Sequence, residues 1–293
     1  MPDRVIIATA GNGQIRAVAA FTTDLVNEAA RRHATSPTAS AALGKALTGG
    51  LLLSAATMKG TGRLTIRIMG QGPLGLILVD AGANGTVRGY VSHPEVDLAP
   101  TPQGTIDVGG AVGQSGTMSI THDTGLGHPY TGTVALQSGQ LGDDFTHYLA
   151  TSMQVPSAVS LGIFVEPSGH IEVAGGLLVQ LMPNAGDEIA WRLEQTLNRL
   201  PSFTQLARQY HTLEAILAAA LEGFAVEILQ VDGTVRFECP CSPERVLRAI
   251  ASLGEAEIRD MIEVEGQAEV RCHFCNERYL VTREQLVELL VNP

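Results

Sequence analysis

The chain has 293 residues, of which 45% are hydrophobic, and its formal net charge is −11. This length and hydrophobic content allow one sizeable core and one smaller module, which favours two domains. Residues 1–185 carry 9 basic and 12 acidic side chains, a net charge of −3, and residues 186–293 carry 10 and 18, a net charge of −8. Because acidic surfaces repel phosphates, this distribution argues against a nucleic acid as partner.

The first 58 residues predict a hairpin followed by two helices. The chain begins Met1-Pro2-Asp3-Arg4 without the long apolar run of a secretory signal, so we expect a cytoplasmic protein. Apolar runs on both sides of Gly11-Asn12-Gly13 predict a β-hairpin over residues 4–20. A helix is expected over residues 23–33, and Ser36-Pro37 supplies the N-cap and first position of a longer helix that runs to about residue 58.

The second helix is the most apolar long stretch of the chain. It contains Lys45 and several hydroxyl side chains, so we expect a buried helix and no membrane partner. Gly44, Gly49 and Gly50 each cost about 1 kcal/mol of helix propensity relative to alanine. We therefore expect close packing against a sheet at these three positions.

From residue 63 onward, apolar and polar residues alternate, which predicts an antiparallel sheet. Asn84-Gly85 is a two-residue hairpin signal between two such segments. A helix is expected over residues 143–153, and an apolar run, GGLLVQLMP, ends this domain at Pro183. The expected strands are residues 63–69, 76–82, 86–91, 117–121, 131–137, 162–166 and 170–173.

Residues 187–221 contain helical segments that Pro201 interrupts, and they include the single tryptophan, Trp191. One interpretation is a helical arm packed on its own core. The other is an arm that covers an apolar surface and leaves it under some condition. Beyond the arm we expect a strand before Cys239, a helix opened by Ser242-Pro243, a short acidic helix, a hairpin and a last helix capped by Thr282 with Gln285 as partner.

The predicted fold class is therefore α+β. A β-rich N-terminal domain with packed helices would span residues 1–183, a helical linker residues 184–230, and a small C-terminal zinc-binding domain residues 231–293. A module of about 60 residues buries little apolar surface, so a bound metal usually completes its stability.

The four cysteines carry the clearest chemical signal, and all lie in the last 55 residues. They form two local pairs, Cys239-Pro240-Cys241 and Cys272-His273-Phe274-Cys275, with 30 residues between the pairs. Two such pairs that fold toward each other supply the four thiolates of one tetrahedral zinc ion. The predicted metal ligands are Cys239, Cys241, Cys272 and Cys275. His273 is a weaker alternative ligand, since four sulfurs already fill the coordination sphere.

Oxidation would most simply join neighbouring cysteines, Cys239 with Cys241 and Cys272 with Cys275. Such bridges close very small loops and cannot replace a metal that ties Cys239 to Cys275 across 37 residues. Release of zinc and collapse of the module are the expected results. In a reducing cytosol, thiols on a metal or in a redox sensor are expected in place of permanent disulfides.

Other chemistry finds little support in the sequence. The chain has no P-loop, no G-x-S-x-G and no G-x-G-x-x-G that leads from a strand into a helix, so we expect no nucleotide partner and no enzyme activity. The histidines lack metal-ligand spacing, and Asp143-Asp144 predicts a helix start. Two alternatives stay open: a constitutive zinc-stabilised protein-interaction module, and a thiol-disulfide oxidoreductase that uses the C-x-x-C pair.

Four segments resemble those of a known family, the redox-regulated bacterial heat-shock chaperones called 33 kDa chaperonins. FECPCSPERV and EVRCHFCNERYLV are similar to the C-terminal redox signature of the family. GQGPLG at residues 70–75 and GGLLVQLMP at residues 175–183 are similar to its core motifs. The resemblance extends over essentially the whole chain.

The resemblance implies an ATP-independent holdase that is inactive when reduced and zinc-bound. It implies that the four cysteines are zinc ligands and that the oxidised pairs are Cys239 with Cys241 and Cys272 with Cys275. It also implies a monomer at rest, a homodimer when oxidised and activated, and unfolding client proteins as partners.

Overall fold

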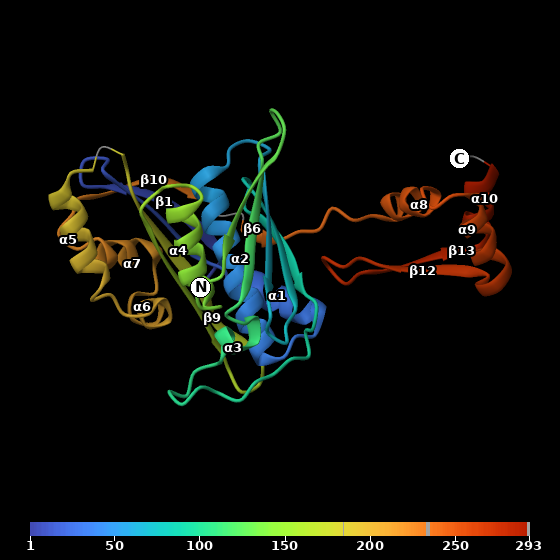
Figure 1. Cartoon of the computed structure of the whole chain (residues 1–293), viewed down its shortest axis with the longest axis horizontal. Helices are drawn as coiled ribbons and strands as arrows, with labels where there is room; N and C mark the ends of the chain where they lie inside the picture. Colours follow the sequence, from blue (N-terminus) through green and yellow to red (C-terminus); the bar gives the residue numbers. More distant parts are fainter. Residues whose placement is uncertain (184, 233–234, 292–293) are drawn as a thin grey trace. The chain divides into compact units, whose positions relative to one another are not determined.

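The structure, a computed structural model, describes residues 1–183, 185–232 and 235–291. The chain forms two compact units, Met1–Glu238 and Cys239–Pro293. The strands of the first unit are β1 Arg4–Ala10, β2 Ile15–Phe21, β3 Arg63–Gly70, β4 Leu76–Gly82, β5 Thr86–Val91, β6 Gly116–Asp123, β7 Tyr130–Ala135, β8 Ser157–Val165, β9 Ile171–Leu181, β10 Val226–Asp232 and β11 Arg236–Phe237. Its helices are α1 Thr23–His33, α2 Pro37–Thr57, α3 Val108–Val112, α4 Leu141–Thr151, α5 Asp187–Leu197, α6 Phe203–Tyr210 and α7 Leu213–Ala220. Figure 1 colours them along the sequence.

The first sheet contains the predicted N-terminal hairpin. Its strand order is β10-β1-β2-β9-β8, and each neighbouring pair is antiparallel. Arg4 pairs with Phe21 at the open end of the hairpin. Strand β9 joins two segments that the sequence analysis kept apart, since it runs without a break from Ile171 to Leu181. The apolar run of residues 175–181 is thus the continuation of a buried strand.

The second sheet has the strand order β11-β5-β4-β3-β6-β7. The predicted alternating segments form its central strands, and Asn84-Gly85 lies in the turn between β4 and β5 as expected. Strand β11 pairs parallel with β5, whereas the other neighbouring pairs are antiparallel. Helix α3 was not predicted from the sequence.

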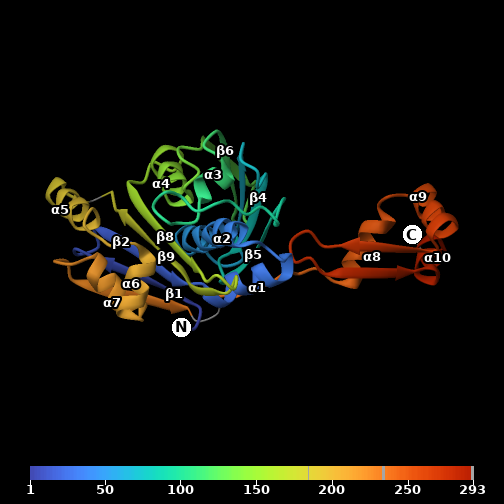
Figure 2. The same cartoon turned by 90° about the horizontal axis from the view of Figure 1, so that it is seen from below.

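Helix α2 lies between the two sheets, as Figure 2 shows. Ser36 caps it, because its Oγ accepts from the Ala39 N–H, and Pro37 occupies the first turn. The helix is long and apolar enough to cross a membrane, but 89% of its most apolar window is buried inside the protein. The expectation of a buried helix is confirmed. The core around α2 includes side chains from both sheets.

Close packing explains the three glycines of α2, although one of them does not meet a sheet. A Cβ at Gly50 would contact strands β3 and β4, and one at Gly44 would contact α1 and strand β8. A Cβ at Gly49 would lie 2.3 Å from the ring of Phe145 in α4, so the expected sheet contact is wrong at this position. At this position α2 packs against another helix, α4, and not against a strand.

The segment predicted as a linker lies within the first unit. Helices α6 and α7 pack on the face of the first sheet opposite α2, where Phe203, Leu206, Ile216 and Leu217 are buried. Strand β10 extends the same sheet at its β1 edge. Helix α5 is held less firmly, because Leu193 is its one buried side chain.

The second unit is small. Its elements are α8 Pro243–Ala251, α9 Glu255–Asp260, the π-helix Met261–Glu265, β12 Gln267–Arg271, β13 Arg278–Thr282 and α10 Arg283–Val291. The predicted caps are confirmed: the Ser242 side chain accepts from the Arg245 N–H, and Thr282 and Gln285 form a reciprocal pair. Strands β12 and β13 form the predicted hairpin.

Substitution of Gly49 by alanine tests the packing of α2. The added methyl group must displace the Phe145 ring in a close-packed core, which costs typically 1–3 kcal/mol. Better helix propensity offsets about 1 kcal/mol of this. Because 2.3 Å is far inside ordinary van der Waals contact, we expect the upper end of this range, a net loss of about 2 kcal/mol in the free energy of unfolding, measured by denaturant titration. Gly127→Ala is the control, because no heavy atom lies within 4 Å of a Cβ at that exposed position. Equal stability of the two variants would contradict the packing.

Candidate metal centre

Two short loops present the four cysteines. Cys239 and Cys241 follow strand β11 and precede α8, whose N-cap is Ser242. Cys272 and Cys275 lie in the turn between β12 and β13. The Cys272 N–H donates to the Glu277 carbonyl at 2.9 Å, and the Asn276 N–H donates to the Cys272 carbonyl at 2.8 Å. These bonds close the turn and direct both sulfurs to the same side.

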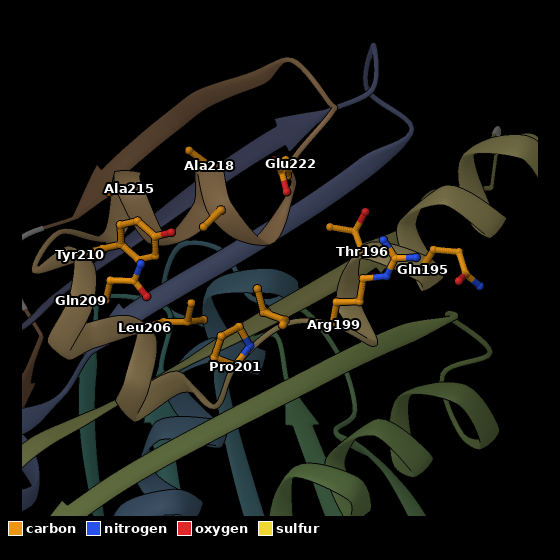
Figure 3. A pocket seen from close by; sticks show the side chains of 12 residues that line it. Gln195, Thr196, Arg199, Pro201, Leu206, Gln209, Tyr210, Ala215, Ala218 and Glu222 are labelled. Atoms are coloured by element: carbon orange, nitrogen blue, oxygen red, sulfur yellow. The ribbon is translucent and has the colours of Figure 1, made fainter.

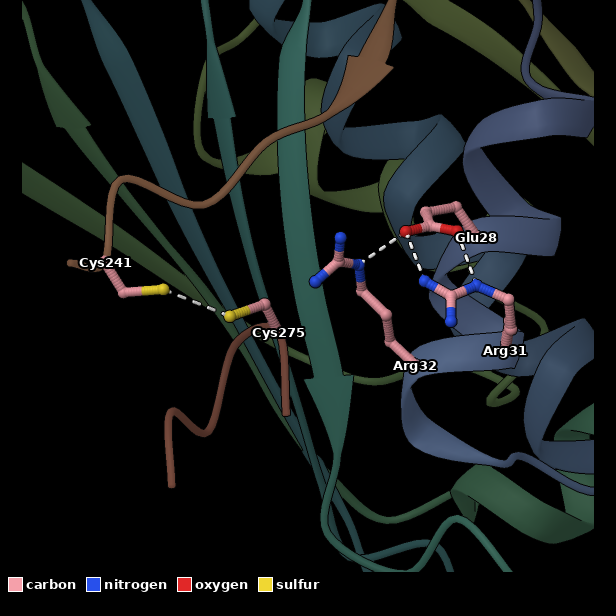
Figure 4. A network of polar contacts seen from close by, with 5 residues as sticks. All are labelled: Glu28, Arg31, Arg32, Cys241 and Cys275. Carbon is pink, nitrogen blue, oxygen red and sulfur yellow. Dashed lines mark hydrogen bonds and ion pairs between the residues drawn. The ribbon is translucent and has the colours of Figure 1, made fainter. Parts of the chain in front are cut away.

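The sulfurs of the two loops converge on one point. All four Sγ atoms lie within 4.8 Å of one another. The Cys239 and Cys272 sulfurs are 3.7 Å apart, and the Cys241 and Cys275 sulfurs are 3.2 Å apart (Figure 4). A tetrahedral zinc ion with Zn–S bonds of about 2.3 Å requires sulfurs about 3.8 Å apart. The cluster therefore has the size of a four-thiolate metal site.

The electrostatics of the cluster also favour a cation. Burial raises the pKa of the Cys272 thiol and that of the Cys275 thiol, so neither group ionises readily without a positive charge nearby. The unit itself supplies no excess of cations, since residues 239–293 carry 6 basic and 10 acidic side chains, a net charge of −4. A divalent metal ion resolves this, because it stabilises all four thiolates at once.

Tyr279 belongs to the site, although the sequence analysis did not single it out. Its phenolic O–H donates to the Cys241 sulfur at 3.0 Å. Tyr279 comes from β13, on the same face as the buried Val281, so it reaches the sulfur of the other loop from the sheet. Hydrogen bonds of this kind orient metal ligands and tune their reactivity. The period-two pattern of β13 was the one signal that could have placed it there.

A metal bound at these cysteines would compensate for a small core. Six buried residues form that core in the described part of this unit: Val246, Ile250, Ile258, Ala268, Val281 and Leu286. Structural zinc contributes about 10–16 kcal/mol of apparent binding free energy in small domains, and this energy is coupled to folding. A metal held by the four sulfurs would thus tie two loops that are separated by 30 residues in sequence.

The other residues considered as metal ligands or acid/base groups lie outside the sulfur cluster. His273 is exposed and does not belong to the cluster of ligand atoms found among the described residues. His122 is buried in the first unit, where its Nε2 lies 3.0 Å from the Tyr148 hydroxyl. Asp144 accepts from the Gln137 N–H at 2.6 Å at the start of α4, which agrees with the predicted helix start.

Comparisons with known proteins agree with this arrangement. The family model described as "Hsp33 protein" matches residues 3–282. The 33 kDa chaperonin of Bacillus subtilis is 50% identical over 284 residues, which cover 97% of each chain, and that of Gloeobacter violaceus is 48% identical over 99% of this chain and 96% of its own. The crystal structure of the 33 kDa chaperonin of Thermotoga maritima superposes with a TM-score of 0.91 at 32% identity, and covers 99% of this chain and 98% of that one. With its β-rich first unit, its helical arm and its C-terminal four-cysteine cluster, this chain belongs to the Hsp33 family.

Proposed function

We propose that this chain is a redox-regulated, ATP-independent holdase that binds unfolding proteins and prevents their aggregation. The observation that carries the proposal is the cluster of four sulfurs from two distant loops, in a unit whose own core is small. Cys239, Cys241, Cys272 and Cys275 would hold one zinc ion, which keeps the thiols ionised and ties the loops together. In this reduced state the protein would be an inactive monomer.

Oxidation acts on the cysteines two at a time. One thiolate of a pair attacks a peroxide oxygen and becomes a sulfenic acid, and the neighbouring thiolate then displaces water to form a disulfide. Each pair consumes one peroxide and two protons, loses two electrons and yields two waters. Cys239 pairs with Cys241, and Cys272 with Cys275. The sulfurs no longer bind a metal, and each bridge closes only a small loop.

Loss of the tie between the loops has consequences for the helical arm. Helix α5 buries only Leu193, and Trp191 is 63% exposed on its surface. A hollow of about 510 Å³ lies beside α5, α6 and α7, between Arg199 and Tyr210 (Figure 3). The helices cover an apolar face of the first sheet that includes Ile15, Ala17 and Leu177. A loosened arm would expose this face to unfolding clients and to a second subunit.

The other properties follow from the same proposal. The active form would be a homodimer, the partners would be unfolding clients, and the protein would act in the cytoplasm without catalysing a reaction. Two alternatives make different predictions: a constitutive zinc-stabilised interaction protein would be insensitive to oxidants, and a thiol-disulfide oxidoreductase would turn over a disulfide substrate many times.

Light scattering from a heat-denatured client tests the function. The zinc-loaded reduced chain is compared with the same chain after warm peroxide treatment and removal of the reagent. Because only the oxidised chain exposes its apolar face, we expect only that form to suppress aggregation. Equal effects of both forms, or no effect of either, would show that the metal site is purely structural here.

Peptide mapping tests the disulfide pairing. Trypsin cleavage after Arg236 and Arg245 places Cys239 and Cys241 in one peptide, and cleavage after Arg271 and Arg278 places Cys272 and Cys275 in another. Local bridges leave two separate peptides, each lighter by two hydrogens. Bridges across the short contacts, Cys241 with Cys275 and Cys239 with Cys272, would link the peptides and keep the loops tied, which would contradict the switch.

Tyr279→Phe tests the hydrogen bond to Cys241. The ring keeps its packing but loses its O–H donor, and loss of such a partner costs typically 10–100-fold in metal affinity. We expect faster release of zinc to a chromogenic chelator, with unchanged far-ultraviolet circular dichroism. Tyr210→Phe makes the same chemical change in the first unit and serves as control. Identical release rates in both variants would exclude a role for the hydroxyl.

A further inference from the structure

Strand β11 covers part of one edge of the second sheet. It consists of Arg236 and Phe237, and it pairs parallel with Thr86 and Val87 of β5. The Arg236 N–H donates to the Gly85 carbonyl at 3.2 Å, and the Glu238 N–H donates to the Val87 carbonyl at 3.1 Å. Without β11, this stretch of β5 would present unpaired backbone groups, as exposed edge strands do.

Side chains hold β11 in place through an alternating pattern. Val235 is 7% exposed and belongs to the core around α2, and Phe237 packs partly buried against the same core. Arg236, between them, points to solvent. The Arg32 guanidinium of α1 lies 5.3 Å from the centre of the Phe237 ring, and Glu28 holds Arg32 at 2.7 Å (Figure 4). The edge thus accepts an extended segment with apolar residues two positions apart.

The position of β11 in the chain couples it to the cysteines. Glu238, which makes the second hydrogen bond to β5, directly precedes Cys239. Two residue pairs are a short attachment, since strands average 5–6 residues. While Cys239 is fixed in the metal cluster, the chain on that side of β11 is ordered. When the C-terminal unit unfolds, that side becomes a flexible chain, whose conformational entropy favours release of β11.

We propose that β11 is an intramolecular plug, and that the β5 edge beneath it binds an extended segment of an unfolding client once oxidation releases the plug. This inference rests on the proposed function and names one of its binding sites. The occupant is an extended polypeptide with alternating apolar side chains, because β11 itself is such a segment. Recognition through backbone groups does not depend on sequence, which suits a partner as varied as unfolding proteins.

Two other strand edges of the first unit, those of β8 and β10, are protected by different means. At β8, the Thr146 hydroxyl of α4 accepts from the Val159 N–H at 3.0 Å. Strand β10 is interrupted opposite β1 by a register shift between Ile7 and Ala8. Those protections belong to the body of the first unit, whereas the cover of β5 lies next to a cysteine of the switch. Of these three edges, that of β5 is therefore the one whose exposure oxidation can control.

Hydrogen exchange on the full chain tests the site directly. The segment of residues 85–91 is followed in the reduced zinc-loaded chain, in the oxidised chain, and in the oxidised chain with reduced, carboxymethylated α-lactalbumin as a permanently unfolded client. We expect faster exchange on oxidation and slower exchange again when the client binds. If the oxidised chain binds the client while exchange in this segment stays unchanged, the proposal that β11 is a plug is wrong, and the holdase function stands.

A pair of variants tests, without oxidation, whether β11 acts as the plug of the β5 edge. Arg236→Pro removes the N–H that donates to Gly85, whereas Arg236→Ala removes the same exposed side chain and keeps the N–H. Loss of one backbone hydrogen bond corresponds to about a fivefold shift toward the open edge. We expect the reduced proline variant, with its zinc content unchanged, to bind the unfolded client several-fold more tightly than the reduced alanine variant.

The remaining outcomes are also decisive. Equal client binding by the two reduced variants, with the first unit folded in both, would contradict the proposal that β11 is a plug. Protection of residues 85–91 that appears without client and rises with chain concentration would identify a second copy of this chain as the occupant, against the proposal. Failure of the oxidised wild-type chain to bind the client would refute the proposed function, and the inference with it.

Discussion

The second unit gathers four thiol groups within 4.8 Å of one another, and we propose that its stability depends on them. Such a cluster is unfavourable by itself, because burial raises the pKa of Cys272 and Cys275 and because four thiolates would repel one another. A bound metal ion, as we propose, would convert this repulsion into a tie between the two loops. Metal-bound thiolates are also open to oxidation, so the element that we propose as stabilising the unit is the one that an oxidant would remove.

The two units differ in how they obtain their stability. The first unit surrounds the buried helix α2 with two sheets and buries a large apolar core. The described part of the second unit has a core of six buried apolar residues, and we propose that a bound metal adds to its stability. Loss of the metal should therefore unfold one unit and leave the other intact. A stable scaffold with an unstable regulatory unit is the arrangement that a reversible switch requires.

The helical arm and β11 belong to the stable first unit, but parts of them are attached to it weakly. Helices α6 and α7 bury apolar side chains on the first sheet, whereas α5 and β11 are attached by few contacts. Segments of low local stability are those that open first when a neighbouring unit unfolds. One of the surfaces that we propose for clients, the β5 edge, lies beneath such a segment.

Much of this could be predicted from the sequence, for reasons that differ from residue to residue. The metal ligands were predictable because Cys239-Pro240-Cys241 and Cys272-His273-Phe274-Cys275 are local patterns, and Ser36-Pro37 likewise marks a helix start locally. The contact of Gly49 with Phe145 was not predictable, since it depends on how two helices cross. Nor were the hydrogen bond from Tyr279 and the pairing of β11 with β5, because both join distant segments. Sequence periodicity shows which face of a strand is buried but not which strand lies beside it.

The most direct test of the account is removal of the metal without any oxidant. The reduced chain is treated with a zinc chelator in the presence of a strong reductant, and hydrogen exchange is followed over both units. We expect residues 239–293 to lose their protection while the strands around α2 keep theirs, because only the second unit depends on the four sulfurs. If the second unit stays protected without metal, its core is sufficient by itself, and the sulfur cluster is not the tie on which the switch depends.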